Sequence, residues 1–169
     1  MASPYNLQST IILNNGVHMP RIHLGVYMTS GRETKSAVTS ALNAGYRAID
    51  SAEWYANEAE VGSSVLSFIQ SPENKSQLKR EDIWFTTKLK ENRGYEATRK
   101  SIKDSIKRSG LGYIDLYLLH SPYGGEKARQ ECWKAVEDAV EEGEVRAGGV
   151  SNFGVKHVRP LPQSSCLSF

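Results

Sequence analysis

A repeated alternation of strand and helix patterns constrains this chain more than any other feature of its sequence. Short apolar runs begin near residues 22, 46, 83, 114 and 145, and amphipathic stretches separate them. Parallel strands need a long crossover connection, and an α-helix usually provides it. The order therefore predicts an α/β fold with five βα units around a parallel sheet.

The expected elements follow one plan, in which an apolar strand is followed by a helix with one apolar face. We expect strands at residues 21–26, 46–50, 83–88, 114–119 and 145–150, and helices at 33–44, 57–69, 95–109 and 126–142. Glycines that suit helix ends follow three of these helices, at Gly45, Gly110 and Gly143. Ahead of the first strand, Asn15 and Gly16 between apolar residues predict a β-hairpin over residues 10–20.

The second helix carries two local predictions. Asn57 precedes Glu60 by three residues, as in a capping box with Asn in place of Ser or Thr. The apolar stripe expected to face the core consists of Val61, Val65, Leu66 and Ile69. Beyond the fifth strand, a helix could start near Val155, but Pro160 and Pro162 forbid a long regular one.

Two architectures use this alternation, and a glycine pattern separates them. An open doubly wound sheet that binds a dinucleotide should carry Gly-x-Gly-x-x-Gly after its first strand. The segment from Gly25 to Gly31 does not match that pattern. We therefore predict an incomplete (β/α)8 TIM barrel of about five βα units, preceded by the hairpin.

Composition excludes several classes of protein. The 169 residues include 21 basic and 19 acidic side chains, which is no footprint of a nucleic-acid partner. No apolar stretch approaches the roughly 20 residues that cross a membrane, and no signal peptide is recognisable. Cys132 and Cys166 do not form a disulfide framework, so we expect a cytoplasmic protein. The histidines lack metal-ligand spacing, and no metal is expected.

Polar residues follow four successive strands where the strands end. Asp50, Lys88 and His120 end the second, third and fourth, and the pair Ser151 and Asn152 follows the fifth. Tyr55 lies in the loop after Asp50. Carboxyl ends of parallel strands share one face, where active sites are built. Alone, each residue suits an ordinary cap, surface or packing role, but together they predict one polar site.

This set suits the reduction of a carbonyl group. An ammonium beside a phenol favours the phenolate, so Lys88 would make Tyr55 a better acid, with Asp50 as counter-ion. His120 could donate a hydrogen bond to a carbonyl oxygen. No side chain supplies hydride, so a nicotinamide is implied. The hydroxyl and amide groups of Ser151 and Asn152 suit its carboxamide.

Four motifs in order resemble the aldo-keto reductases, over about residues 8 to 158. They are Asp-Ser-Ala-Glu-Trp-Tyr-Ala-Asn-Glu from Asp50, Thr-Thr-Lys-Leu ending at Leu89, Ile-Asp-Leu-Tyr-Leu-Leu-His-Ser-Pro from Ile114, and Gly-Val-Ser-Asn-Phe-Gly from Gly149. The resemblance implies a TIM barrel with a hairpin across its bottom. It also implies reduction of aldehydes and ketones with NADPH, bound without a Rossmann domain.

The resemblance assigns roles by position. It makes Tyr55 the proton donor, with Lys88 and Asp50 tuning it, and gives His120 the task of orienting the substrate carbonyl. It places Ser151 and Asn152 on the nicotinamide amide, with Asp50 also counted among the cofactor contacts. The remaining cofactor and substrate contacts that it implies are Gly25, Val26 and Tyr27 for the cofactor, and Tyr27, Trp54 and His120 for the carbonyl substrate.

The sequence departs from the family in length. Members run to about twice this size, so strands six to eight and the loops that grip the pyrophosphate and the adenosine phosphate have no counterpart here. We expect residues 1–158 to be the barrel part and residues 159–169 to be an irregular tail foreign to the fold, from an altered reading frame or a retained intron.

Three hypotheses stay open at this point. The chain is an NADPH-dependent carbonyl reductase, an inactive fragment that misfolds or associates with full-length subunits, or a binding module like the channel accessory subunits of the same lineage. Open barrel edges predict self-association, and we expect weak or no NADPH binding by an isolated monomer. The particular carbonyl substrate and the preference between NADPH and NADH cannot be read from this sequence.

Overall fold

The computed structural model describes residues 6–161, which form a five-stranded parallel sheet, a separate hairpin and a layer of helices. The sheet strands lie in sequence order: β3 (Leu24–Gly25), β4 (Ala48–Asp50), β5 (Trp84–Leu89), β6 (Ile114–Leu119) and β7 (Val145–Val150). The hairpin pairs β1 (Thr10–Ile12) with β2 (His18–Pro20) in antiparallel register. This is the α/β arrangement of a partial barrel that the alternation predicted.

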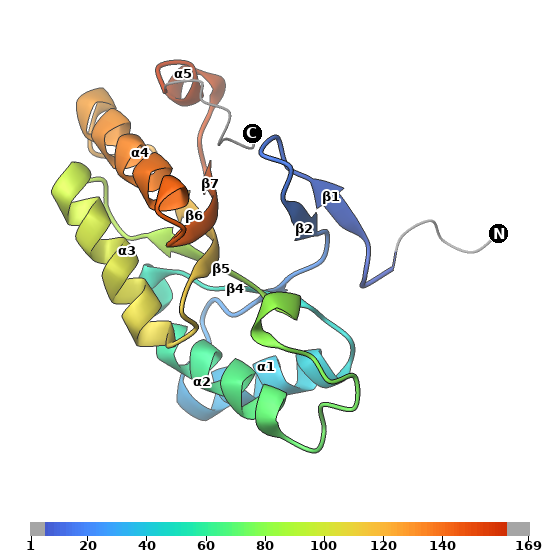
Figure 1. The fold of residues 1–169 in the computed structure, drawn as a ribbon. Helices are drawn as coiled ribbons and strands as arrows, with labels where there is room; N and C mark the ends of the chain where they lie inside the picture. Colours follow the sequence, from blue (N-terminus) through green and yellow to red (C-terminus); the bar gives the residue numbers. More distant parts are fainter. Residues whose placement is uncertain (1–5, 162–169) are drawn as a thin grey trace.

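The long helices cover the sheet on the side away from the hairpin (Figure 1). They are α1 (Gly31–Asn43), α2 (Glu58–Gln70), α3 (Tyr95–Ser109) and α4 (Glu126–Glu141), and the single turn α5 (Val155–Val158) follows β7. Two 3-10 turns, η1 (Glu53–Tyr55) and η2 (Arg80–Asp82), precede α2 and β5. The short α5 agrees with the expected effect of Pro160, and the predicted tail lies largely outside the described residues.

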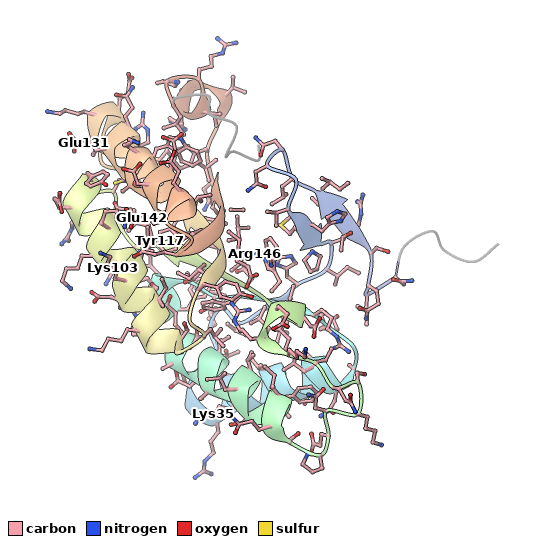
Figure 2. All side chains as sticks on the ribbon, viewed as in Figure 1. Lys35, Lys103, Tyr117, Glu131, Glu142 and Arg146 are labelled. Atoms are coloured by element: carbon pink, nitrogen blue, oxygen red, sulfur yellow. The ribbon has the colours of Figure 1, made fainter. Side chains whose placement is uncertain are left out.

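The main core fills the space between sheet and helices. Phe85, Tyr117 and Trp133 are completely or almost completely buried there, and Cys132 packs among them as an ordinary apolar side chain. Tyr117 points into this layer, whereas Lys35 and Lys103 extend from the outer surface (Figure 2). Each large apolar side chain buried in this way contributes about 1.5–3 kcal/mol to folding.

A smaller apolar cluster joins the hairpin to the opposite face of the sheet. Leu13 packs there with Ala48 and Trp84, and Ala147 completes the buried set. Asn15, in the hairpin turn, donates a hydrogen bond to the Arg146 carbonyl at 3.0 Å. The hairpin therefore covers the amino ends of the strands and leaves their carboxyl ends uncovered.

Helices α2 and α3 approach each other closely at Gly62. A Cβ atom on Gly62 would lie 1.7 Å from the carbonyl oxygen of Ser109, closer than any side chain could be accommodated. Only glycine permits this contact. The contact brings the start of α2 beside the last turn of α3.

The structure corrects several local predictions. Leu66 is 36% exposed, and Phe68 takes its expected place in the core. The first two strands are shorter than predicted, at Leu24–Gly25 and Ala48–Asp50. The predicted capping box at α2 does not form, because the Asn57 side chain makes no capping hydrogen bond. That side chain binds elsewhere, as described below.

Candidate active site

Adjacent strands β4 and β5 bring Asp50 and Lys88 together at the carboxyl edge of the sheet. The Lys88 side chain is only 7% exposed, and its ammonium forms an ion pair with the Asp50 carboxylate. It also donates to the Ser51 carbonyl oxygen at 2.8 Å. A buried ammonium requires partners of this kind, and Lys88 therefore has the counter-ion that the sequence predicted.

The Tyr55 hydroxyl is the third neighbour of the Lys88 ammonium. The two groups lie 3.4 Å apart, and the ammonium is 4.8 Å from the centre of the tyrosine ring. Tyr55 lies in η1, which ends at Ala56 in a left-handed conformation with φ of 53°. This turn after β4 points the phenol back across the strand ends.

Two aromatic side chains flank Tyr55. The Tyr27 ring lies 4.9 Å from it, centre to centre, and the His120 ring lies 5.8 Å away in an edge-on orientation. His120 follows the last residue of β6. The structure therefore brings together side chains from β4, β5 and β6 that are far apart in the sequence.

The protonation of His120 follows from its surroundings. Burial lowers the pKa of this imidazole below its usual value, and the Lys88 ammonium adds to the effect. Nδ1 is buried and has no hydrogen-bond partner among the described residues. A buried N–H without an acceptor is costly, so we assign the proton of the neutral ring to Nε2.

A pocket of about 380 Å³ opens beside these groups, lined by Tyr27, Trp54, Tyr55 and His120. The hollow next to it, of about 500 Å³, is lined in part by Trp54, His120 and Asn152. The Trp54 indole N–H donates to the Lys90 carbonyl at 2.8 Å. That bond holds an otherwise exposed ring at the border between the two spaces.

Ser151 and Asn152 lie where the sequence placed them, directly after β7. The Asn152 backbone has φ of 63°, and its side-chain amide donates to the His120 carbonyl at 2.9 Å and to the Ser151 hydroxyl at 3.1 Å. The Asn152 carbonyl oxygen and the Ser151 hydroxyl proton are therefore the groups that remain for a ligand.

The segment from Gly25 to Tyr27 contributes less uniformly than predicted. Nothing lies within 4 Å of a Cβ placed on Gly25, and Tyr27 is 67% exposed. Val26, in contrast, is completely buried in the main core. Its backbone is also bonded within the protein, because the N–H donates to the Asp50 carbonyl at 3.1 Å and the carbonyl oxygen accepts from Asn57 at 2.9 Å.

Sequence reasoning missed the role of Asn57. Its carboxamide accepts from the Ser51 hydroxyl at 2.7 Å and donates to the carbonyls of Val26 and Thr29 at 2.9 and 3.0 Å. The side chain thus ties the loop after β3 to the loop after β4. Its place in the motif around Tyr55 was visible, but the partners were not.

The described residues contain no group of three or more His, Cys, Asp or Glu side chains that could hold a metal ion. Over the same residues, no helix is both long and apolar enough to cross a bilayer.

Known proteins resemble this chain in sequence over most of its length. A sequence model described as the aldo/keto reductase family matches residues 21–166. The chain belongs to the aldo/keto reductase family. An uncharacterised oxidoreductase of Schizosaccharomyces pombe is 50% identical over 158 residues, which are 94% of this chain and 55% of the relative. The glyoxal reductase of Bacillus subtilis is 39% identical over 160 residues, or 94% of this chain and 54% of that enzyme.

A solved structure shows the same likeness in three dimensions. The aldo-keto reductase of Bombyx mori, determined in complex with NADP, superposes with a TM-score of 0.79 at 31% identity. The match covers 89% of this chain and 52% of that protein. The chain therefore spans about half the length of the relatives that it matches.

Proposed function

We propose that this chain carries the catalytic residues of an NADPH-dependent reductase that converts aldehydes or ketones to alcohols. The observation that supports it most directly is the 3.4 Å contact between the Tyr55 hydroxyl and the buried Lys88 ammonium, beside an open pocket. A phenol held in this way can release a proton, because the ammonium stabilises the phenolate that remains.

The residues around the pocket fit the nicotinamide end of the cofactor. Space is open at Gly25, the Tyr27 ring is exposed, and Ser151 and Asn152 keep one donor and one acceptor free for a carboxamide. NADPH is favoured by the family and by the NADP in the Bombyx mori structure. When bound, the reduced nicotinamide supplies the hydride.

The chain's own residues then handle the carbonyl oxygen. The Nε2–H of His120 donates a hydrogen bond to it and polarises the bond. As the carbon gains hydride, the electron pair of the C=O π bond moves to the oxygen, and the Tyr55 hydroxyl transfers its proton there. The Lys88 ammonium stabilises the Tyr55 phenolate, and the Asp50 carboxylate holds Lys88 in place through their ion pair. The product is the alcohol, and Tyr55 regains its proton from solvent.

The test follows NADPH consumption by the purified chain in the presence of a small aldehyde such as glyoxal. NADPH is supplied at high concentration, because an isolated monomer is expected to bind it weakly. We expect aldehyde-dependent turnover that falls at least about 1,000-fold in Tyr55→Phe, because the proton donor is lost. Binding of NADPH by Tyr55→Phe should stay unchanged, since the ring is retained. A folded chain without turnover, or an active Tyr55→Phe variant, would contradict the proposal.

The edges of the sheet favour a second candidate function, association with another barrel segment. Among the described residues, β3 and β7 each pair with a strand on one side only. Unpaired edges can add a strand from another chain. Sedimentation should then show dimers or larger species, and a strictly monomeric chain at high concentration would exclude this association.

The free, buried Cys132 suits a reducing compartment, so we propose that the chain acts in the cytoplasm.

A further inference from the structure

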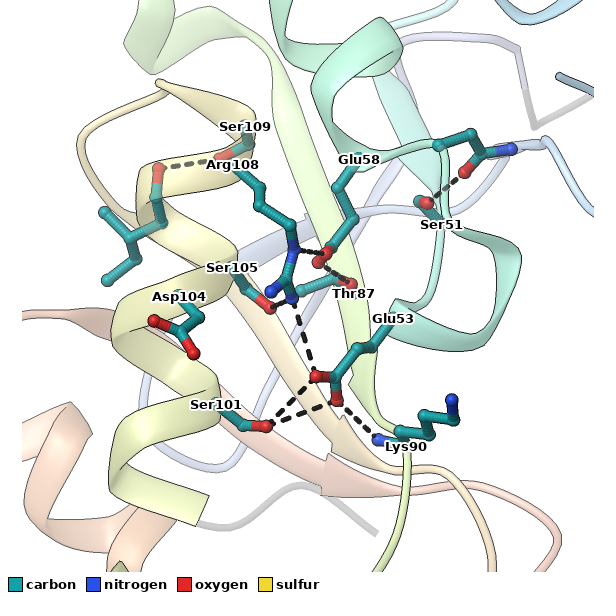
Figure 3. Close-up of polar contacts among 12 residues, drawn as sticks. Ser51, Glu53, Glu58, Thr87, Lys90, Ser101, Asp104, Ser105, Arg108 and Ser109 are labelled. Carbon is teal, nitrogen blue, oxygen red and sulfur yellow. Dashed lines mark hydrogen bonds and ion pairs between the residues drawn. The ribbon is translucent and has the colours of Figure 1, made fainter. Parts of the chain in front are cut away.

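Two carboxylates flank Tyr55 in the sequence, those of Glu53 and Glu58, and both point toward α3 (Figure 3). Glu53 comes two residues before the tyrosine, and Glu58 three residues after it. The Glu58 side chain is only 2% exposed, and that of Glu53 is 20% exposed. Buried carboxylates need charged or hydrogen-bonding partners, and both of these have them.

One guanidinium joins the two carboxylates. Arg108 Nε lies 2.7 Å from Glu58, and its Nη2 lies 3.6 Å from Glu53 and donates to the Ser105 hydroxyl at 2.9 Å. Burial acts to lower the pKa of Arg108, but the carboxylates of Glu58, Glu53 and Asp104 together outweigh it, and the pKa is raised. The fork of an arginine can hold two acceptors in fixed directions, which a lysine cannot.

The same carboxylates are bound to the residues around Lys88. Glu58 accepts a hydrogen bond from the Thr87 hydroxyl at 2.6 Å, and Glu53 accepts one from the Lys90 backbone N–H at 2.9 Å. Ser101, on α3, also donates to Glu53 at 3.2 Å. The tyrosine turn, the end of β5 and α3 are therefore joined in one network.

The turn that carries Tyr55 depends on such ties. None of the residues of η1 is buried, so the turn has little apolar packing to fix its position. The close contact at Gly62 places Arg108 beside Glu58. Polar contacts from α3, rather than apolar packing, therefore hold this turn in position.

We propose that Arg108 is a positioning residue for the catalytic tyrosine, and that its clamp on Glu53 and Glu58 sets the distance between the Tyr55 hydroxyl and the Lys88 ammonium. Arg108 lines neither of the two pockets beside Tyr55. The inference rests on the proposed function only where it concerns turnover. The geometric claim stands by itself.

Turnover of the aldehyde with NADPH tests the catalytic part. In Arg108→Leu, kcat should fall about 10- to 100-fold, because small displacements of a reacting group are costly. KM should change by less than about 2-fold, since the pocket is untouched. Arg108→Lys should recover part of kcat. Lys107→Leu, which removes the neighbouring cation of the same helix turn, should match the wild type. Equal losses in Arg108→Leu and Lys107→Leu would overturn the proposal.

The NMR signals of carbon-labelled tyrosine test the geometry without turnover. We expect the Tyr55 signal, assigned through Tyr55→Phe, to move in Arg108→Leu, and its ring contact with Tyr27 to weaken. Lys107→Leu should leave both unchanged. If Arg108→Leu does not fold, Arg108→Lys carries the test, with a smaller shift expected. An unmoved Tyr55 signal in the folded Arg108 variant would overturn the proposal, even if the chain were an active reductase.

Discussion

Two charged clusters lie at opposite ends of the same sheet, and they differ in how completely their polar groups are paired. At the amino ends, Asp115 is completely buried and accepts from Arg80 at 2.8 Å, from Arg146 at 2.8 Å and from the Phe85 N–H at 2.9 Å. At the carboxyl ends, Lys88 and Asp50 are paired, but they adjoin a pocket.

This difference distinguishes an ion cluster that stabilises the fold from one that belongs to a candidate reactive site. The two Asp115 oxygens are occupied by fixed donors, so this cluster joins η2, β5, β6 and β7 and offers nothing to a ligand. At the other end, the Tyr55 hydroxyl and the His120 ring border open space. Hydrogen-bonding groups that stay unused beside a cavity therefore indicate a functional site better than the burial or the charge of a cluster does.

Loss of the ion cluster at the amino ends should have the greatest effect on stability. Asp115→Ala leaves Arg80 and Arg146 without their shared carboxylate, and the Arg80 side chain is only 15% exposed. We expect the free energy of unfolding to fall by about 3–5 kcal/mol, the usual cost of unpairing a buried charge. Urea denaturation measures it. Asp104→Ala, which breaks an exposed pair with Lys100, is the control and should change stability little.

Substitution of Lys88 removes the cation from the cluster at the carboxyl ends. Lys88→Met should cost at least about 100-fold in kcat, because the charge that stabilises the Tyr55 phenolate is gone. Its effect on stability should be smaller than that of Asp115→Ala, since Asp50 is 29% exposed and can rehydrate. Steady-state kinetics and urea denaturation on one preparation test both parts. Lys35→Met, on an exposed helix surface, is the control. Should Lys88→Met destabilise more than Asp115→Ala, the contrast between the clusters would fail.

A weaker effect is expected in how the stability of the protein depends on pH. Because burial and Lys88 lower the pKa of His120 below 6.5, the unfolded chain binds a proton more readily than the folded one. Stability should therefore decline as pH falls below about 6.5. Burial also lowers the pKa of His23, which adds to the decline.

The free energy of unfolding, measured for the wild type and for His120→Asn between about pH 7 and pH 5.5, separates the two contributions. The variant should show a shallower slope, and His23→Asn should remove the remainder. A slope that neither substitution alters would show that other groups control the pH response.

The sequence predicted elements best where the signals are local. Residues Tyr95–Ser109 form α3 and Ile114–Leu119 form β6 as expected, because a cap glycine defines the helix end and a run that is apolar except for Asp115 defines the strand. The meeting of Asp50, Lys88 and His120 followed from parallel topology alone. Their catalytic roles stay predictions that the experiments above address.

Contacts between distant segments could not be predicted in the same way. Arg108 and Glu58 are 50 residues apart, and nothing in either local pattern names the other as partner. Asn57 matched a helix-cap pattern, yet its carboxamide binds three partners in neighbouring loops instead. Leu66 fits the apolar period of α2 but is 36% exposed. Each of these outcomes depends on packing in three dimensions.

The carboxamide of Asn57 has a consequence for how this molecule would age. Its nitrogen supplies both hydrogen bonds to the loop that carries Tyr27, at Val26 and Thr29, and its oxygen accepts the third bond from Ser51. Hydrolysis of that amide to a carboxylate changes a single atom and hardly alters the shape. It would nevertheless place a negative charge against two carbonyl oxygens and release the wall of the pocket, so one slow chemical lesion could silence a molecule that still appears folded.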